Sequence, residues 1–252
     1  MRSNLKTETN FMFHLTLRLL LILPILCGIS NAQEKPNKHT CRILFLNRPA
    51  TAPIKLYLFD GVKSQEVELP SMNLSPVYEL AAGPLNLTLL PAPPQDPQHL
   101  PIGAPSAMVP ETLPDFYLLL LSDPTNKVAP VRMQVVNASA EKITKGQTLW
   151  FNLTDLTIGG KLGAEKMLIK PKSSMVTNPP LSDAGNYPVS IAYHKEGEET
   201  SYPICETNWL HDPRSRSLGF IIYQEGARIP RVMVFPDFRN EPSKSTELPS
   251  QP

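Results

Sequence analysis

The sequence predicts an all-β protein of the antiparallel, immunoglobulin-like sandwich type. Its 252 residues include 28 prolines and only 12 glycines, and proline opposes long helices because it lacks an amide donor and clashes with the preceding turn. Short apolar runs, many of them alternating with polar residues, are separated by turn residues, which is typical of strands. No amphipathic helix of even about ten residues interrupts these runs, so a sandwich is the expected architecture.

The N-terminus is predicted to be a secretory signal peptide over residues 1–32. Basic residues precede a mostly apolar run over 19–29, and small residues lead to a cleavage point after Ala32. The run is about half of the ~20 residues that a membrane-spanning helix needs; a retained N-terminal anchor is the alternative. We expect an exported protein with no stable membrane span after cleavage, located in the periplasm or outside the cell, with outer-membrane association as one option.

The first part of the mature chain is expected to be a polar arm followed by five strands. Residues 33–40 are polar, and from Cys41 onward apolar runs are broken by turn residues. The clearest period-2 alternation lies at 85–89, where leucines alternate with Asn86 and Thr88. Strands are predicted over residues 42–46, 54–59, 66–69, 78–80 and 85–89.

A proline-rich crossover loop is predicted over residues 91–114. No regular ladder is expected to tolerate this density of proline, so the segment should be extended, in part as polyproline II. A proline-rich ligand for another domain is the alternative to a stiff connection between strands. The prolines are Pro91, Pro93, Pro94, Pro97, Pro101, Pro105, Pro110 and Pro114.

Strand patterns resume after the loop. Residues 116–121 form a continuous apolar run, as in a strand that is buried on both faces. Residues 240–252 are polar and contain proline, which predicts a disordered tail. The other strands are predicted over residues 131–135, 149–153, 167–169, 189–194, 218–224 and 229–235.

These strands are expected to form one elaborated sandwich over residues 41–239. The alternative is two smaller sandwiches that are divided near the proline-rich loop at 91–114. A short similarity between residues 43–47 (ILFLN) and 133–137 (MQVVN) is compatible with two related halves.

One disulfide is predicted between Cys41 and Cys205, the two cysteines that follow the signal peptide. Disulfides form in oxidising compartments, and closing so long a loop could stabilise the fold by up to ~4–5 kcal/mol. Two buried thiols are the alternative.

The search for catalytic chemistry yields no motif, and we expect neither catalytic residues nor a metal or cofactor. HExxH, CxxC and GxSxG motifs do not occur, and the histidines are not at ligand spacing. The formal net charge of +1 gives no field that would attract nucleic acid. A hydrolase could still assemble its site from distant residues, with His194 or His211 beside an acid and a nucleophile.

The candidate ligand surface is polar and lies late in the chain. Arg214 and Arg216 could bind an anion or an acidic sugar, although the same cluster, which begins at His211, could be a solvated inter-strand turn. Trp209 is expected in a loop, where it could stack on a sugar ring. Trp150 falls within a regular strand and is expected to pack in the core.

Residues 42–90 resemble a family of uncharacterised bacterial envelope or secreted β-sandwich domains. The resemblance rests on an opening apolar strand that ends at Asn47 and Pro49, on residues 54–61 (IKLYLFDG), and on Tyr78 and an Ala-Gly pair before a strand. It implies export and a sandwich fold. Residues 148–153, followed by Ile-Lys-Pro, also resemble periplasmic pilus chaperones, but the basic anchors of that family have no counterpart that can be placed, so this resemblance is not adopted.

From the sequence we expect a non-catalytic exported β-sandwich that acts as a binding or structural module of a bacterial cell envelope. Exposed strand edges would be its natural interaction surface, and its partner would be a protein or a glycan rather than nucleic acid. A carbohydrate-binding module and a hydrolase with a dispersed site are the alternatives.

Overall fold

The computed structural model describes residues 38–195, 197–198, 200–224 and 226–238. The predicted signal peptide, most of the predicted polar arm and the predicted disordered tail lie outside the described residues. Within the described part the chain forms sixteen strands and no helix, which confirms the all-β prediction. The described residues include no helix of the length and apolarity that crossing a membrane requires.

The first sandwich consists of two four-stranded sheets, A and B. Sheet A has the strand order β4-β1-β7-β8 and sheet B the order β3-β2-β5-β6. Strands β1 and β7 pair in parallel, and the other neighbours pair antiparallel. The strands are β1 (Lys38–Phe45), β2 (Lys55–Phe59), β3 (Ser64–Glu68), β4 (Tyr78–Ala82), β5 (Leu85–Leu90), β6 (Ser106–Val109), β7 (Asp115–Ser122) and β8 (Val131–Asn137).

The second sandwich consists of sheets C and D. Sheet C has the strand order β12-β9-β15-β16 and sheet D the order β11-β10-β13-β14. Here β9 and β15 are the parallel pair. The strands are β9 (Thr148–Asn152), β10 (Thr157–Leu162), β11 (Glu165–Ile169), β12 (Ser174–Thr177), β13 (Gly185–His194), β14 (Ser201–His211), β15 (Arg216–Ile222) and β16 (Arg231–Asp237).

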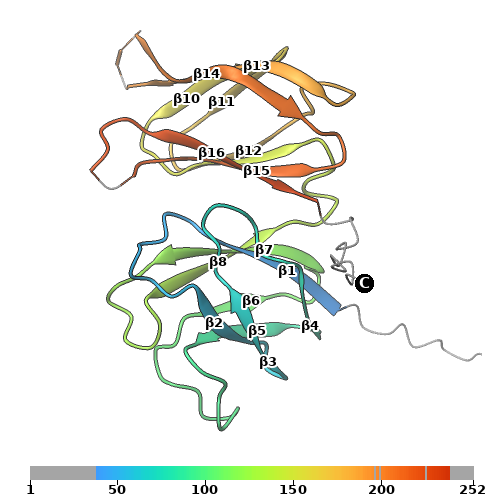
Figure 1. The fold of residues 1–252 in the computed structure, drawn as a ribbon, viewed down its shortest axis with the longest axis vertical. Coiled ribbons are helices and arrows are strands. Elements are labelled where there is room, and N and C mark those ends of the chain that lie inside the picture. Colours follow the sequence, from blue (N-terminus) through green and yellow to red (C-terminus); the bar gives the residue numbers. More distant parts are fainter. Residues whose placement is uncertain (1–37, 196, 199, 225, 239–252) are drawn as a thin grey trace, which may run out of the picture. The chain divides into compact units, whose positions relative to one another are not determined.

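The two sandwiches repeat one topology. Each strand of sheets A and B has a counterpart eight strands later in sheets C and D, and the parallel pair occupies the same place in both (Figure 1). The short similarity between residues 43–47 and 133–137 does not mark this repeat. Those segments lie in and beside β1 and in β8, whereas the counterpart of β1 is β9.

Three hydrophobic cores lie between the four sheets. The first core contains side chains of sheets A and B, the second those of sheets A and C, and the third those of sheets C and D. In β7, Phe116 and Leu118 belong to the first core, whereas Tyr117 and Leu119 belong to the second. The continuous apolar run of β7 is therefore buried on both faces, as predicted, because sheet A has a core on each side.

The proline-rich segment contains a strand, contrary to our prediction. Strand β6 pairs with β5 at the edge of sheet B, with Pro105 and Pro110 outside its ends. An edge strand needs ladder hydrogen bonds on one side only, so flanking prolines are compatible with it. The segment lies wholly within the first sandwich, and the two sandwiches are instead joined by residues 138–147, between β8 and β9.

Strand β14 is the most consequential element that the sequence did not reveal. Trp209 was expected in a loop, but it lies in β14, which is the longest strand of the described part. β14 is an edge strand of sheet D, and most of its residues are exposed or only partly buried. The strand consequently lacks the apolar alternation by which the others were recognised. Strands β10 and β12 were missed as well.

No disulfide joins Cys41 and Cys205 in this structure, so the predicted bridge is corrected. Cys41 is buried in the first core, whereas Cys205 in β14 packs against the third core. Sheets A and C lie between these cores. Because packed sheets are about 10 Å apart, the two thiols are far beyond the distance that a disulfide can span.

Candidate binding groove between β14 and β16

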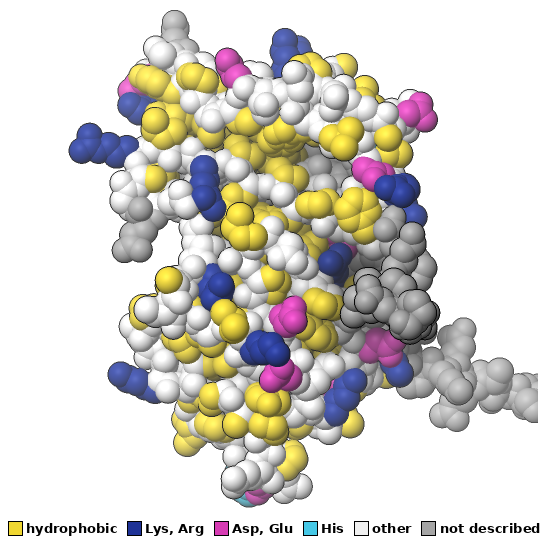
Figure 2. Space-filling view, viewed as in Figure 1, with side chains coloured by type: hydrophobic (Ala, Val, Ile, Leu, Met, Phe, Trp, Pro, Cys, Tyr) yellow, Lys and Arg dark blue, Asp and Glu magenta, His cyan; other side chains and the backbone are white. Residues whose placement is uncertain are grey.

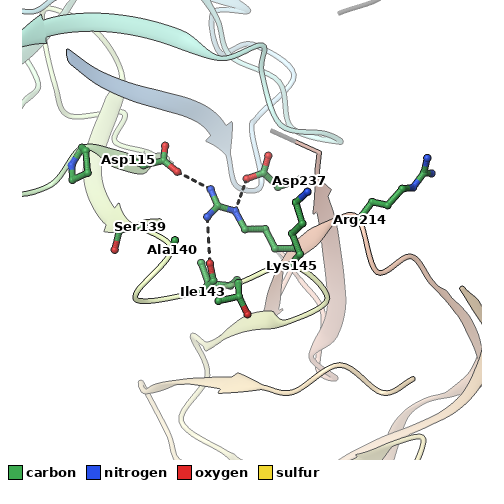
Figure 3. Close-up of a pocket in the computed structure, with 10 residues that line it drawn as sticks. Asp115, Ser139, Ala140, Ile143, Lys145, Arg214 and Asp237 are labelled. Carbon is green, nitrogen blue, oxygen red and sulfur yellow. Dashed lines mark hydrogen bonds and ion pairs between the residues drawn. The ribbon is translucent and has the colours of Figure 1, made fainter. Parts of the chain in front are cut away.

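Arg216 lies in a buried ion network where the two sandwiches meet. Its guanidinium donates from Nη2 to Asp115 Oδ2 at 2.8 Å and from Nε to Asp237 Oδ2 at 3.0 Å, and Figure 3 shows the two carboxylates on different sides of it. A third hydrogen bond runs from Nη1 to the Ala138 carbonyl. Asp115 begins β7 and Arg216 begins β15, so the network joins sheet A to sheet C.

Asp237 is the other centre of this network, and its side chain is fully buried. It accepts hydrogen bonds from Arg42 and from the Tyr117 hydroxyl, the latter at 2.6 Å. Burial, with the nearby charge of Asp237, raises the pKa of Tyr117 well above its usual value. A buried carboxylate needs such partners to offset its lost hydration. The fold thus uses Arg216 to join the sandwiches, which leaves little of this side chain accessible to an external ligand.

Arg214 has a different environment from Arg216. It lies on the rim of a cavity of about 630 Å³ beside the ion network, together with Lys145 (Figure 3). Its guanidinium pairs with Asp212 at 2.7 Å, and hydrogen bonds from Arg214 lower the pKa of Asp212 to about 2. Both residues lie between β14 and β15, so this part of the predicted cluster is an inter-strand turn.

A second concavity is a groove between the edge strands β14 and β16, which we call the edge groove. It has a volume of about 650 Å³ and is lined by residues of sheets C and D. β14 ends sheet D and β16 ends sheet C, so among the described residues no further strand of either sheet covers this side of the third core. Figure 2 shows hydrophobic side chains exposed in the recess between these elements, in the upper half of the view.

One wall of the edge groove is aromatic. Trp209 in β14 meets Tyr187 of the paired strand β13 edge to face, with ring centroids 6.4 Å apart and planes at 86°. Trp209 also stacks on Trp150, which is buried in the core as predicted. The neighbouring Leu210 is 73% exposed and also lines the groove. The opposite wall consists of Val232, Val234 and Pro236 of β16.

His211 closes one end of the edge groove. It is only 6% exposed, and its Nε2 atom has no hydrogen-bond partner among the described residues. Its ring meets Tyr187 edge to face at 6.5 Å. Buried polar atoms in folded proteins nearly always have a partner, so an unpaired one requires an explanation, such as a ligand. Polar groups of Asn208, Ser215 and Ser217 line the same groove.

The structure therefore divides the four residues of the predicted ligand surface between two places. Trp209 and His211 line the edge groove, whereas Arg214 and Arg216 line the cavity at the junction of the sandwiches. Tyr187 was not recognised from the sequence, although it precedes a proline at the start of a predicted strand. Burial raises the pKa of Tyr187 to about 12, so its hydroxyl remains protonated at neutral pH.

A dispersed hydrolase site would require hydrogen bonds between a histidine, an acid and a nucleophile. In the part of the chain that the structure describes, no hydrogen bond joins His211 to Ser215 or Asp212; the Ser215 hydroxyl donates to the Asp212 carbonyl instead. His194 lies at the opposite end of the β13–β14 pair from His211. The described residues also contain no group of three or more His, Cys, Asp or Glu that could hold a metal ion.

The edge groove therefore presents an aromatic wall, an apolar wall and a buried histidine nitrogen. Comparison of the sequence with protein-family models and with curated proteins found no match.

Proposed function

We propose that this protein is a non-catalytic, exported β-sandwich module of a bacterial cell envelope, and that it binds its partner in the edge groove. The signal-like residues 1–32 support export. The observation that carries the binding function is the unpaired, buried Nε2 atom of His211 at the end of a groove with an aromatic wall. Ligand pockets typically combine apolar and aromatic walls with a few polar groups that fix orientation.

Of the two partner classes expected from the sequence, a glycan fits this groove best. A sugar ring has apolar C–H faces and hydroxyl groups around its rim. The rings of Trp209 and Tyr187 can contact the C–H faces. The sugar hydroxyl groups can form hydrogen bonds with His211 Nε2 and with the hydroxyls of Ser215 and Ser217. The groove volume of about 650 Å³ is in the usual range for a small-molecule ligand.

The test is binding of soluble oligosaccharides to the full chain, first on a glycan array and then by titration calorimetry. Trp209→Ala should weaken binding by about tenfold or more, because truncating a buried aromatic anchor typically costs ~2 kcal/mol. His211→Phe should also weaken binding while keeping the groove filled. Leu168→Ala is the matched control, since Leu168 in β11 is an exposed leucine of the same sandwich that does not line the edge groove.

Two results would contradict the proposal. Either no saccharide binds, or the Trp209 and His211 variants bind as tightly as the unchanged protein. Cleavage of a bound saccharide would favour the hydrolase alternative instead. An extended peptide that added to the exposed edge of β14 would identify a protein partner, and its binding would depend on main-chain pairing more than on His211.

A further inference from the structure

A separate cavity lies at the other end of the β15–β16 pair from the Arg216 network. Arg216 pairs with Asp237 at one end of these strands, and Ile222 pairs with Arg231 at the other. The cavity has a volume of about 460 Å³. Residues of both sandwiches line it. The first sandwich contributes Asn47, Arg48, Pro49, Ser71 and Met72, and the second contributes Gln224, Arg231 and Met233. We call it the two-arginine cavity.

One arginine comes from each sandwich, and both lack a strong acceptor. The Nε atoms of Arg48 and Arg231 are buried and have no hydrogen-bond partner within the described ranges. Arg48 makes one long bond, from Nη1 to the Ala52 carbonyl at 3.4 Å. Arg231 contacts Met233 Sδ from Nη2 at 2.9 Å, and a thioether sulfur is a weak acceptor.

The two arginines also lack a counter-charge among the described residues. Arg42, Arg214 and Arg216 each pair with an aspartate within 4.0 Å. No such ion pair of Arg48 or Arg231 occurs in the described part of the chain, and none of the residues that line the cavity is acidic. The remaining polar lining groups are the Asn47 and Gln224 amides and the Ser71 hydroxyl, all of which can donate hydrogen bonds.

An anion would remove both unfavourable features of this arrangement. Two positive charges that face one cavity repel each other, and a buried N–H group without an acceptor costs the desolvation of that group. A guanidinium forms two parallel hydrogen bonds to two oxygens of a carboxylate or phosphate. Two guanidinium groups can therefore engage up to four oxygens and balance two negative charges.

We propose that the two-arginine cavity binds a phosphate group. Phosphate offers a charge of about −1.5 to −2 at neutral pH and several tetrahedrally placed oxygens, whereas a carboxylate offers one charge and two oxygens. The cavity is larger than a phosphate ion, so it can also admit the start of a molecule that carries the phosphate as an ester. The proposed site is distinct from the edge groove and does not depend on the function proposed for it.

The experiment measures binding of inorganic phosphate to the full chain by titration calorimetry at low ionic strength, with chloride at equal ionic strength as the reference. Arg48→Gln and Arg231→Gln should each weaken phosphate binding by about tenfold or more, since a hydrogen bond between charged groups contributes ~1.5–3 kcal/mol. Arg228→Gln, which changes an arginine outside the cavity lining, should leave the affinity unchanged. Glycerol phosphate in a parallel titration distinguishes a free ion from a phosphate ester as the preferred ligand.

Several outcomes would overturn the proposal. One is the absence of phosphate binding; another is an equal loss of binding in the Arg228 variant, which would show non-specific attraction. If a glutamine variant fails to fold, Arg48→Lys keeps the charge and removes the planar fork, and unchanged phosphate affinity in that variant would also refute the site. Glu225 is close in sequence and lies outside the described residues. If Glu225→Gln is required before phosphate binds, an internal counter-charge fills the site instead.

Discussion

Replacing Arg216 with leucine should destabilise the protein strongly. The substitution removes two carboxylate contacts at 2.8 and 3.0 Å and takes from Asp237, whose side chain is fully buried, one of the cations that pair with it. Breaking a buried ion pair by removing one partner typically costs about 3–5 kcal/mol. The free energy of unfolding typically falls by about 2 kcal/mol per molar urea, so the urea concentration at the unfolding midpoint should fall by roughly 1.5–2.5 M.

The assay is equilibrium urea unfolding followed by two signals. Tryptophan fluorescence reports only the second sandwich, because Trp150 lies in β9 and Trp209 in β14, whereas far-ultraviolet circular dichroism reports both. The two signals should coincide in the unchanged protein, since the second core contains side chains of both sandwiches. In the Arg216→Leu variant the unfolding transitions that the two signals report should occur at different urea concentrations, because the charged link between sheets A and C is lost.

Arg214→Leu is the matched control for this prediction. Arg214 is two residues away and its side chain is 69% exposed, and it pairs with Asp212 at 2.7 Å. An exposed ion pair contributes at most about 1 kcal/mol, so this variant should unfold close to the unchanged protein. The reasoning is refuted if Arg216→Leu costs less than about 1 kcal/mol, or if both variants lose the same stability.

Three further predictions concern packing, pH and thiols. Gly219→Ala should lower the free energy of unfolding by about 1–3 kcal/mol through overpacking, because a Cβ there would lie 2.3 Å from the ring of Trp150; an unchanged near-ultraviolet dichroism spectrum and midpoint would contradict this. The pKa of Tyr187 is about 12 in the folded state against 10.0 normally, so the unfolded chain releases this proton first and stability should fall as pH rises from 10 to 12. Tyr187→Phe should flatten that part of the stability profile, and an unaltered slope would count against it. Cys41 and Cys205 should both react with a thiol reagent after unfolding, with equal gel mobility with and without reductant, whereas a mobility shift on reduction would indicate a disulfide.

Strands whose apolar residues follow a clear pattern were predictable from local sequence. The alternating leucines of β5 and the continuous apolar run of β7 were recognised because each pattern reports how many faces of a strand are buried. Edge strands carry less of this signal. β14 has one neighbour in its sheet and mostly exposed or partly buried residues, so its apolar residues do not alternate regularly with polar ones.

The candidate site was predictable only in part for a related reason. Trp209 and His211 were selected for their side-chain chemistry, and both line the edge groove. Arg216 was selected on the same ground, but it lies at the start of β15, where its donors meet Asp115 and Asp237. Residue type shows what a side chain can bind, whereas the neighbours supplied by distant strands decide whether those groups are already used.

Local patterning by itself determined that this chain is all-β and where most of its strands lie, since these features depend on residues a few positions apart. The division into two sandwiches at residues 138–147, the core between sheets A and C, and the separation of Cys41 from Cys205 were decided only by tertiary structure. Each depends on which strands pair and which faces pack across long sequence separations. The same is true of the edge groove and the two-arginine cavity, whose walls meet only when strands far apart in the chain are brought together.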